Sequence, residues 1–114
     1  MRGTELPLRT RGVCCQLPLS DDRRWAEDKA ALLRALADPT RLSMVAALSK
    51  AEQPVCICDF TAAFDLSQAT ISHHMARLRD AGLVESEKRG IWIYYRLSDS
   101  LSASTRRLLE ALTA

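Results

Sequence analysis

Four cysteines in two tight pairs are the residues of this chain whose chemistry is most specific. Cys14 and Cys15 are adjacent, and Cys56 and Cys58 are separated by one residue in the run VCICD at 55–59. Thiolates select soft ions over Mg²⁺ or Ca²⁺. The pairing predicts a soft-ion site formed by all four thiols. Two alternatives are buried structural cysteines and a thiol–disulfide switch between the two pairs.

The one-residue spacing of Cys56 and Cys58 constrains the backbone around them. Side chains two residues apart point about 200° apart on a regular helix, but lie on one face of an extended segment. We therefore expect an irregular helix entry, with Cys56 outside the first turn. A helix N-terminus lowers the pKa of a thiol, which favours the thiolate that binds soft ions.

A second group of side chains suits the reading of DNA bases from the first two turns of a helix. Glutamine can bond adenine through two hydrogen bonds, and serine or threonine can reach bases or phosphates. Cations further along the chain are placed to contact phosphates. The predicted DNA-binding residues are Ser67, Gln68, Thr70, Ser72, His73, Arg77, Lys88 and Arg89, and Arg79 and Arg96 are further phosphate candidates. The alternative is an ordinary solvent-facing helix and turn.

His73 and His74 are adjacent, so on a helix they point about 100° apart and do not chelate one ion together. We expect one to face DNA and the other to pack or hydrogen-bond inside the protein. No nucleophile, base and orienting group are spaced as a catalytic site requires, so the sequence predicts that the chain is not an enzyme.

These residues lie on a regular series of predicted elements. Ser20, Asp21 and Asp22 are typical of a helix start, and Asp38 followed by Pro39 begins a second helix. A polar loop at 50–54 leads into an apolar stretch at 55–64 that becomes helical. Ser67 caps the next helix, which runs to about residue 81 before Gly82.

After Gly82 the apolar period changes from that of a helix to that of a strand. Residues 83–97 alternate around a turn at Arg89 and Gly90, which predicts a β-hairpin. Asp99 and Ser100 then start a last helix. The fold class is therefore mainly α with a β-hairpin wing (α+β), a winged helix-turn-helix. Its predicted dimer interface contains the apolar residues Trp25, Leu32, Leu101, Leu108, Leu109 and Leu112.

Length and charge limit the remaining classes. A chain of 114 residues fits one domain, with a flexible N-terminal arm at 1–19 and a winged-helix domain at 20–114. The net charge of +2 excludes a polybasic tail, so DNA binding has to come from where the charges lie. Without an apolar run long enough for a membrane span or a signal peptide, we expect a cytoplasmic protein.

Four segments together resemble the ArsR/SmtB family of metal-sensing repressors. They are ALADPTRL at 35–42, VCICD at 55–59, LSQATISHH at 66–74 and LRDAGL at 78–83 with the hairpin after it. The similarity covers about residues 25–112. It implies a homodimeric repressor that binds a two-fold symmetric operator without the ion and releases it when the ion binds, with 67–74 as the recognition helix.

The resemblance also bears on the effector. The cysteine run is similar to the thiolate sites of arsenic and cadmium/lead sensors, but Thr61 stands where the best-known arsenic sensors carry a third cysteine. Trivalent arsenic favours three thiolates, and the Cys14–Cys15 pair resembles that of actinobacterial-type arsenic repressors. The resemblance implies As(III) as effector, with Sb(III), Cd(II) or Pb(II) as alternatives, and no organic cofactor. The last helix lacks the histidine and aspartate ligands of zinc and nickel sensors.

Overall fold

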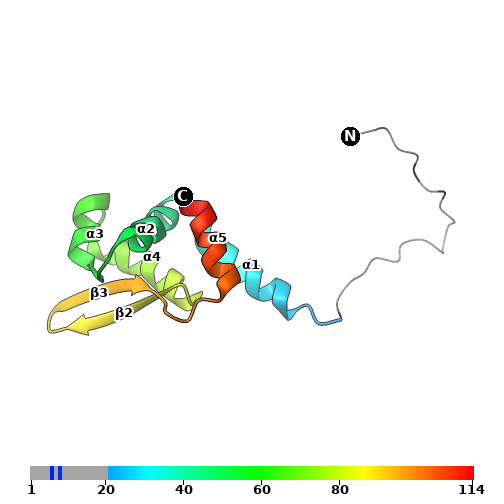
Figure 1. Cartoon of the computed structure of the whole chain (residues 1–114). Helices are drawn as coiled ribbons and strands as arrows, with labels where there is room; N and C mark the ends of the chain where they lie inside the picture. Colours follow the sequence, from blue (N-terminus) through cyan, green and yellow to red (C-terminus); the bar gives the residue numbers. More distant parts are fainter. Residues whose placement is uncertain (1–5, 7, 9–20) are drawn as a thin grey trace.

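The computed structural model describes residues 6, 8 and 21–114, so the predicted ligands Cys14 and Cys15 lie outside the described residues. Between residues 21 and 114 five helices alternate with three short strands (Figure 1). In chain order these are α1 (Arg24–Leu36), α2 (Pro39–Lys50), β1 (Val55–Cys56), α3 (Ile57–Phe64), α4 (Gln68–Asp80), β2 (Val84–Arg89), β3 (Trp92–Leu97) and α5 (Ala103–Thr113). None of the helices in this part of the chain has the length and apolarity needed to span a bilayer.

Local capping signals place the central helices where the sequence predicts them. The Asp38 side chain accepts a hydrogen bond from the backbone N–H of Arg41 at 3.0 Å, with Pro39 as first residue of α2. Ser67 likewise caps α4, and Gly82 follows α4 with a φ of +77°, a conformation that glycine adopts without strain. The break between α3 and α4 falls at Asp65, which is left-handed with a φ of +53°.

The starts of the outer helices differ from the prediction. Helix α1 begins at Arg24 rather than directly after Ser20, because Asp22 accepts a hydrogen bond from the Arg24 backbone N–H at 2.9 Å. Helix α5 begins at Ala103, capped by Ser102, and not at Asp99. Asp99 instead ends the wing, since its carboxylate and backbone N–H bind side chains of the two strands.

The wing is part of a three-stranded antiparallel sheet in the order β1-β3-β2. Cys56 of β1 pairs with Tyr94 of β3, so the strand that carries the first cysteine is hydrogen-bonded to the wing. The hairpin loop is Gly90–Ile91, one residue later than predicted, because Arg89 pairs with Trp92 and Gly90 takes a φ of +62°. Ile91 is therefore an exposed residue at the tip of the wing.

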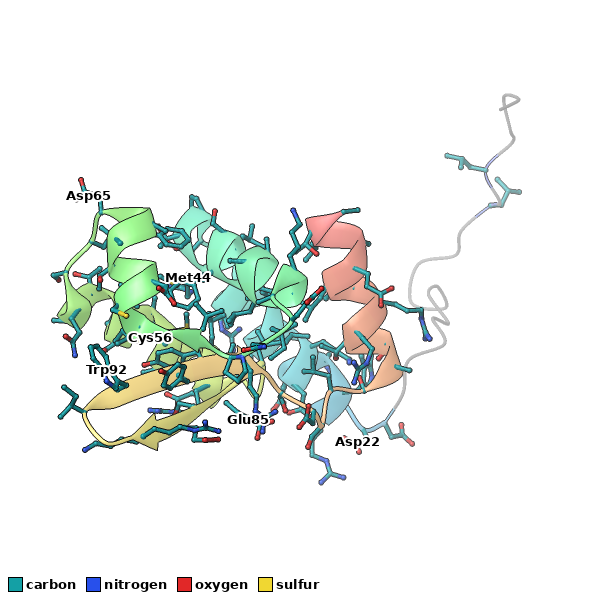
Figure 2. All side chains as sticks on the ribbon, turned by 60° about the vertical axis from the view of Figure 1, so that its left-hand side comes forward. Asp22, Met44, Cys56, Asp65, Glu85 and Trp92 are labelled. Carbon is teal, nitrogen blue, oxygen red and sulfur yellow. The ribbon has the colours of Figure 1, made fainter. Side chains whose placement is uncertain are left out.

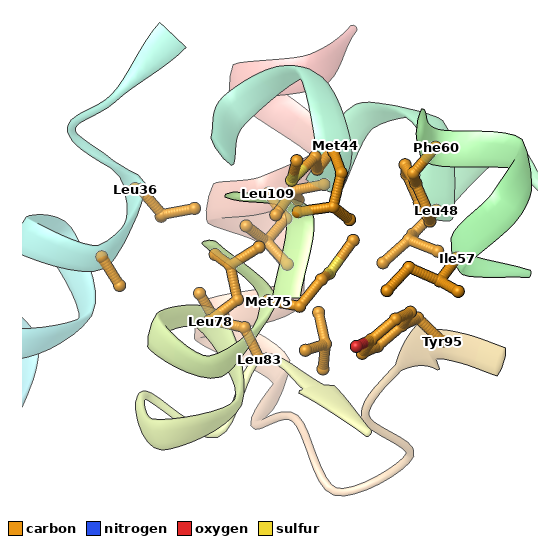
Figure 3. Close-up of a cluster of buried hydrophobic side chains, with 14 of the residues drawn as sticks. Leu36, Met44, Leu48, Ile57, Phe60, Met75, Leu78, Leu83, Tyr95 and Leu109 are labelled. Carbon is orange, nitrogen blue, oxygen red and sulfur yellow. The ribbon is translucent and has the colours of Figure 1, made fainter. Parts of the chain in front are cut away.

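One apolar core holds these elements together (Figure 3). Side chains from all five helices and from β3 converge on it, and the largest fully buried ones are Phe60, Met44, Ile71, Met75, Leu78 and Leu83. The α3–α4 pair and the hairpin after it form the winged helix-turn-helix that the sequence predicts. The core thus fixes α4, with its apolar face inward and its polar face outward.

Candidate thiol site and nucleic-acid interface

The two described cysteines lie side by side at the start of the helix-turn-helix. Cys56 is extended, with a ψ of 144°, and is the N-terminal cap of α3, while Cys58 lies in its first turn (Figure 2). The Cys58 thiol lies 2.8 Å from the Cys56 sulfur, and both cysteines are free. This is the irregular helix entry that the spacing predicts. Two bonds of about 2.3 Å to one ion can bridge the gap between these sulfurs.

The acidity of Cys58 is opposite to the sequence prediction. The helix N-terminus was expected to lower the pKa of the thiols. The pKa of Cys58 is raised, first because the thiol bonds to the Cys56 sulfur, and further by desolvation and by the nearby charges of Cys56 and Asp59. A sulfur neighbour that stabilises the protonated form outweighs the backbone N–H that would stabilise the thiolate. Cys58 is exposed and Cys56 is buried, so an ion would approach from the Cys58 side.

Within residues 21–114, no group of three or more histidine, cysteine, aspartate or glutamate side chains is placed to hold a metal ion. The side chain at position 61, where a third cysteine was considered, is held by another bond. The Thr61 hydroxyl donates to the Cys58 carbonyl oxygen at 2.9 Å, which fixes it along the helix. The described pair therefore supplies two thiols, and the other two predicted ligands belong to residues 14 and 15.

Three of the side chains that are predicted to read DNA, at the start of α4, also make hydrogen bonds within the protein. The Ser67 hydroxyl accepts from the Thr70 backbone N–H at 3.2 Å and bonds the Thr70 hydroxyl at 2.9 Å. Ser72 is half-buried, and a hydrogen bond with it lowers the pKa of Tyr95, although burial of Tyr95 raises that pKa more. Ser67, Thr70 and Ser72 thus help to hold the first turns of α4 in place.

Gln68 and His73 are exposed on the outer face of α4, together with Ala69, which the sequence analysis did not select. Ala69 is four residues before His73 and lies on the same face. Its methyl group suits apolar contact with a thymine methyl. Helical periodicity about the buried residues of α4 would have identified it, but only polar side chains were considered as readers.

The two histidines differ in exposure, and one of them packs inside the protein as predicted. His73 is exposed, and its Nε2 accepts a hydrogen bond from Arg77 at 3.4 Å. His74 is half-buried, and its Nδ1 lies 3.3 Å from the Arg41 guanidinium on α2. His73 therefore lies with the predicted reading face, and His74 is part of the contact between α2 and α4.

The cations of the wing have acidic neighbours. Arg89 forms an ion pair with Glu87, which lowers the pKa of that carboxyl, and Arg96 forms one with Glu85 at 3.3 Å. Lys88 makes no ion pair with any residue in 21–114. Exposed ion pairs contribute little free energy, so a phosphate can replace Glu87 as the partner of Arg89.

The predicted dimer residues separate into two groups. Leu32 and Leu109 are 8% and 3% exposed and belong to the core of the chain, and Leu101 and Leu108 are half-buried against it. Trp25 and Leu112 are 63% and 49% exposed, and so is Leu33 at 51%, which the sequence analysis omitted. Helices α1 and α5 lie close together at one point, where Lys29 of α1 donates a hydrogen bond to Ser104 of α5 at 3.5 Å. Trp25, Leu33 and Leu112 are therefore the exposed large apolar side chains on these two helices.

Comparison with known proteins agrees with this geometry. Residues 38–86 match the family model described as "Bacterial regulatory protein, arsR family". The chain is 42% identical over 79 residues to the arsenical resistance operon repressor of Escherichia coli, covering 69% of this chain and 67% of that protein. It is 34% identical to the biofilm growth-associated repressor of Agrobacterium fabrum, over 97% of this chain and 91% of that one. Among solved structures, NolR from Sinorhizobium fredii has a TM-score of 0.69 at 31% identity, covering 86% of this chain and 94% of that chain.

Proposed function

This chain belongs to the arsR family of bacterial regulatory proteins, and we propose that it represses transcription until As(III) binds its cysteine thiolates and releases it from operator DNA. That it is a DNA-binding winged-helix repressor rather than an enzyme follows from the family and from its relatives. The proposal adds the effector, the ligands and the direction of the response.

The placement of Cys56 and Cys58 carries the proposal. Their sulfurs lie 2.8 Å apart at the first turn of α3, which a short turn joins to α4. Bonds from one ion to both sulfurs act on the backbone that enters the helix-turn-helix. Thiolates are the donors that a soft ion such as As(III) prefers, and an arsenical resistance operon repressor is among the relatives.

The third thiolate has to come from Cys14 or Cys15, and we propose that it comes from a second copy of the chain. Six residue steps separate Cys15 from Asp21, which span at most about 20 Å. Helix α1 has 13 residues and is itself about 20 Å long. Its buried residues are Leu32, Ala35 and Leu36, so its C-terminal part is the one that joins the core. The start of α1 and helix α3 lie at opposite ends of the domain (Figure 1).

Dimerisation through α1 and α5 would bring a partner's arm toward the site. The exposed Trp25, Leu33 and Leu112 supply an apolar surface on these two helices. In such a dimer the two α4 helices read successive major grooves about 34 Å apart, on a two-fold symmetric operator. Gln68, Ala69 and His73 would contact base edges, and Arg77, Lys88 and Arg89 would contact phosphates.

The test uses a fluorescent DNA duplex selected from a random pool by the wild-type protein, with a scrambled duplex as control. Anisotropy is titrated separately with arsenite, antimonite, cadmium, lead and zinc. We expect arsenite to release the selected duplex from the wild type. Cys56→Ser, Cys58→Ser and the Cys14→Ser/Cys15→Ser double variant should bind the duplex and keep it.

Each of the other outcomes would change the proposed function in a defined way. Release by cadmium or lead but not by arsenite would identify a four-thiolate sensor and overturn the arsenic assignment. A normal arsenite response in the double variant would place the whole site within residues 21–114. A response to peroxide with a new disulfide, but none to any ion, would make the chain a redox switch.

A further inference from the structure

Arg41 on the first turn of α2 joins three helices through its side chain. Its Nε donates to the carbonyl oxygen of Ala35 at 2.6 Å, and its Nη2 donates to that of Arg34 at 3.5 Å. Both carbonyls lie in the last turn of α1, and that of Arg34 also accepts the backbone N–H of Ala37 at 3.4 Å. The third nitrogen, Nη1, lies 3.3 Å from Nδ1 of His74 on α4. None of the functions predicted above involves this cluster.

The chemistry of the Arg41–His74 contact fixes the state of the imidazole. A guanidinium only donates hydrogen bonds, so Nδ1 of His74 has to accept and the ring proton has to be on Nε2. A protonated imidazole has hydrogens on both nitrogens and cannot accept. The other titratable groups around the ring are Asp38, whose carboxylate accepts from the Arg41 backbone N–H, and His73, whose ring centroid lies 6.1 Å away.

We infer that Arg41 is a positioning residue that fastens the reading helix α4, through His74, to the C-terminal end of α1. This inference rests on the proposed function, because α1 also carries the exposed Trp25 in its first turn and Leu33 in its last turn, both part of the proposed dimer surface. In a dimer, Arg41 then lies on one path between the two reading helices, beside the direct contacts of α1 with α4. Two reading helices have to match successive major grooves, so a change in this contact alters operator affinity without any contact to DNA.

Arg41→Lys tests the positioning role. Lysine keeps the charge, but its compact ammonium cannot hold two carbonyls and an imidazole as the planar guanidinium does. We expect the dissociation constant for the selected duplex to rise about tenfold or more, as loss of a charged hydrogen bond allows, with the salt dependence unchanged. Arg106→Lys, an exposed arginine on α5, is the matched control and should bind as the wild type does. Circular dichroism and light scattering verify that each variant is a folded dimer.

A pair of variants at His74 supplies a second test, by rescue. The asparagine oxygen of His74→Asn can accept the bond from Arg41, whereas the side chain of His74→Leu cannot. We expect His74→Leu to weaken binding to the selected duplex about as much as Arg41→Lys does. His74→Asn should bind the duplex nearly as the wild type does.

Two results would overturn the inference. One is an Arg41→Lys dissociation constant within about twofold of the wild type, since that excludes the expected loss. The other is equal binding to the selected duplex by His74→Leu and His74→Asn, since the acceptor for Arg41 would then have no effect. If the wild type selects no duplex from the pool, the proposed function itself fails. If it selects one and Arg41→Lys binds normally, only the positioning role fails.

Discussion

The raised pKa of Cys58 predicts how the affinity for different ions depends on pH. The neighbouring Cys56 sulfur and the charge of Asp59 hold this pKa above the ordinary thiol value. Since free thiols titrate near about pH 8.5, Cys58 stays protonated between about pH 6 and 8. Cd²⁺ has to displace that proton to bind the sulfur. Each displaced proton makes the apparent affinity rise about tenfold per pH unit.

Arsenite behaves differently because it is neutral arsenous acid in this range. Three thiols and As(OH)₃ form As(SR)₃ and three molecules of water, so each thiol proton leaves with a hydroxide of the acid. No net proton is released. The affinity for arsenite should therefore be nearly constant over the interval in which the affinity for Cd²⁺ rises by a factor of about ten per pH unit from Cys58 alone.

Competition titrations at about pH 6, 7 and 8, followed by thiolate-to-ion absorbance, measure how the logarithm of the affinity changes per pH unit for each ion. This change is the slope for that ion. Calorimetry in two buffers of different ionisation enthalpy counts the protons released. Cys58→Ser should lower the Cd²⁺ slope by about one, because one proton is no longer displaced. A Cd²⁺ slope that is the same in wild type and Cys58→Ser would refute the reasoning. Cys58 would then already be a thiolate, as a dominant helix N-terminus would make it.

Three further predictions concern the dimer and the reading helix. Leu33→Glu should yield a folded monomer by light scattering, whereas Leu109→Ala should leave a dimer whose unfolding free energy is lower by about 2–5 kcal/mol; the reverse pattern would exchange their roles. Gln68→Ala should weaken binding to the selected duplex by about 1–3 kcal/mol and hardly affect a scrambled one, and equal losses on both would indicate a phosphate contact. Ser67→Ala should lower the thermal midpoint and the unfolding free energy by about 1 kcal/mol, and an unchanged midpoint would contradict its role as the cap of α4.

Local signals account for the parts of the fold that the sequence predicted well. Asp38, Ser67 and Gly82 each act on the backbone within a few residues, so their effect can be inferred from neighbours in the chain. Asp99 has the same capping ability, but Arg96 and the wing bind it. This competition depends on a hairpin that has to be folded first, and for that reason the start of α5 was predicted too early.

The dimer surface shows a different limit of sequence reasoning. Leu32 and Leu33 are adjacent apolar residues on α1, yet the first is 8% exposed and the second 51%. Periodicity identifies α1 as a helix with apolar positions on more than one side, but not which side meets the core. The core contacts of α2 and α4 decide this, because they bury Leu32 and Leu36 and leave Leu33 and Trp25 outside.

The same reasoning shows why the candidate site was only partly predictable. If both cysteines are to approach one ion, their spacing requires that Cys56 precede the helix, and the structure places Cys56 before the first turn of α3. The acidity of Cys58 depends on a distance of 2.8 Å between two sulfur atoms, which no spacing rule gives. The partial charges of a helix N-terminus are screened by solvent around an exposed thiol, so they lower its pKa only weakly. A neighbouring thiol at contact distance changes that pKa more strongly.

Cys56 also joins the proposed site to both parts of the fold that are predicted to contact DNA, the wing and the helix-turn-helix. Its backbone pairs with Tyr94 in the wing, and its side chain caps the first helix of the helix-turn-helix. To shift a dimer from 1:99 to 99:1 in favour of the released state, an ion has to bind that state more tightly by about 5.5 kcal/mol. An ion that bonds Cys56 and Cys58 equally well in both states releases nothing, however tight the bonds are. The difference has to come from a ligand whose distance from the site depends on the state, and in the site proposed above Cys14 or Cys15 of a second copy would be that ligand.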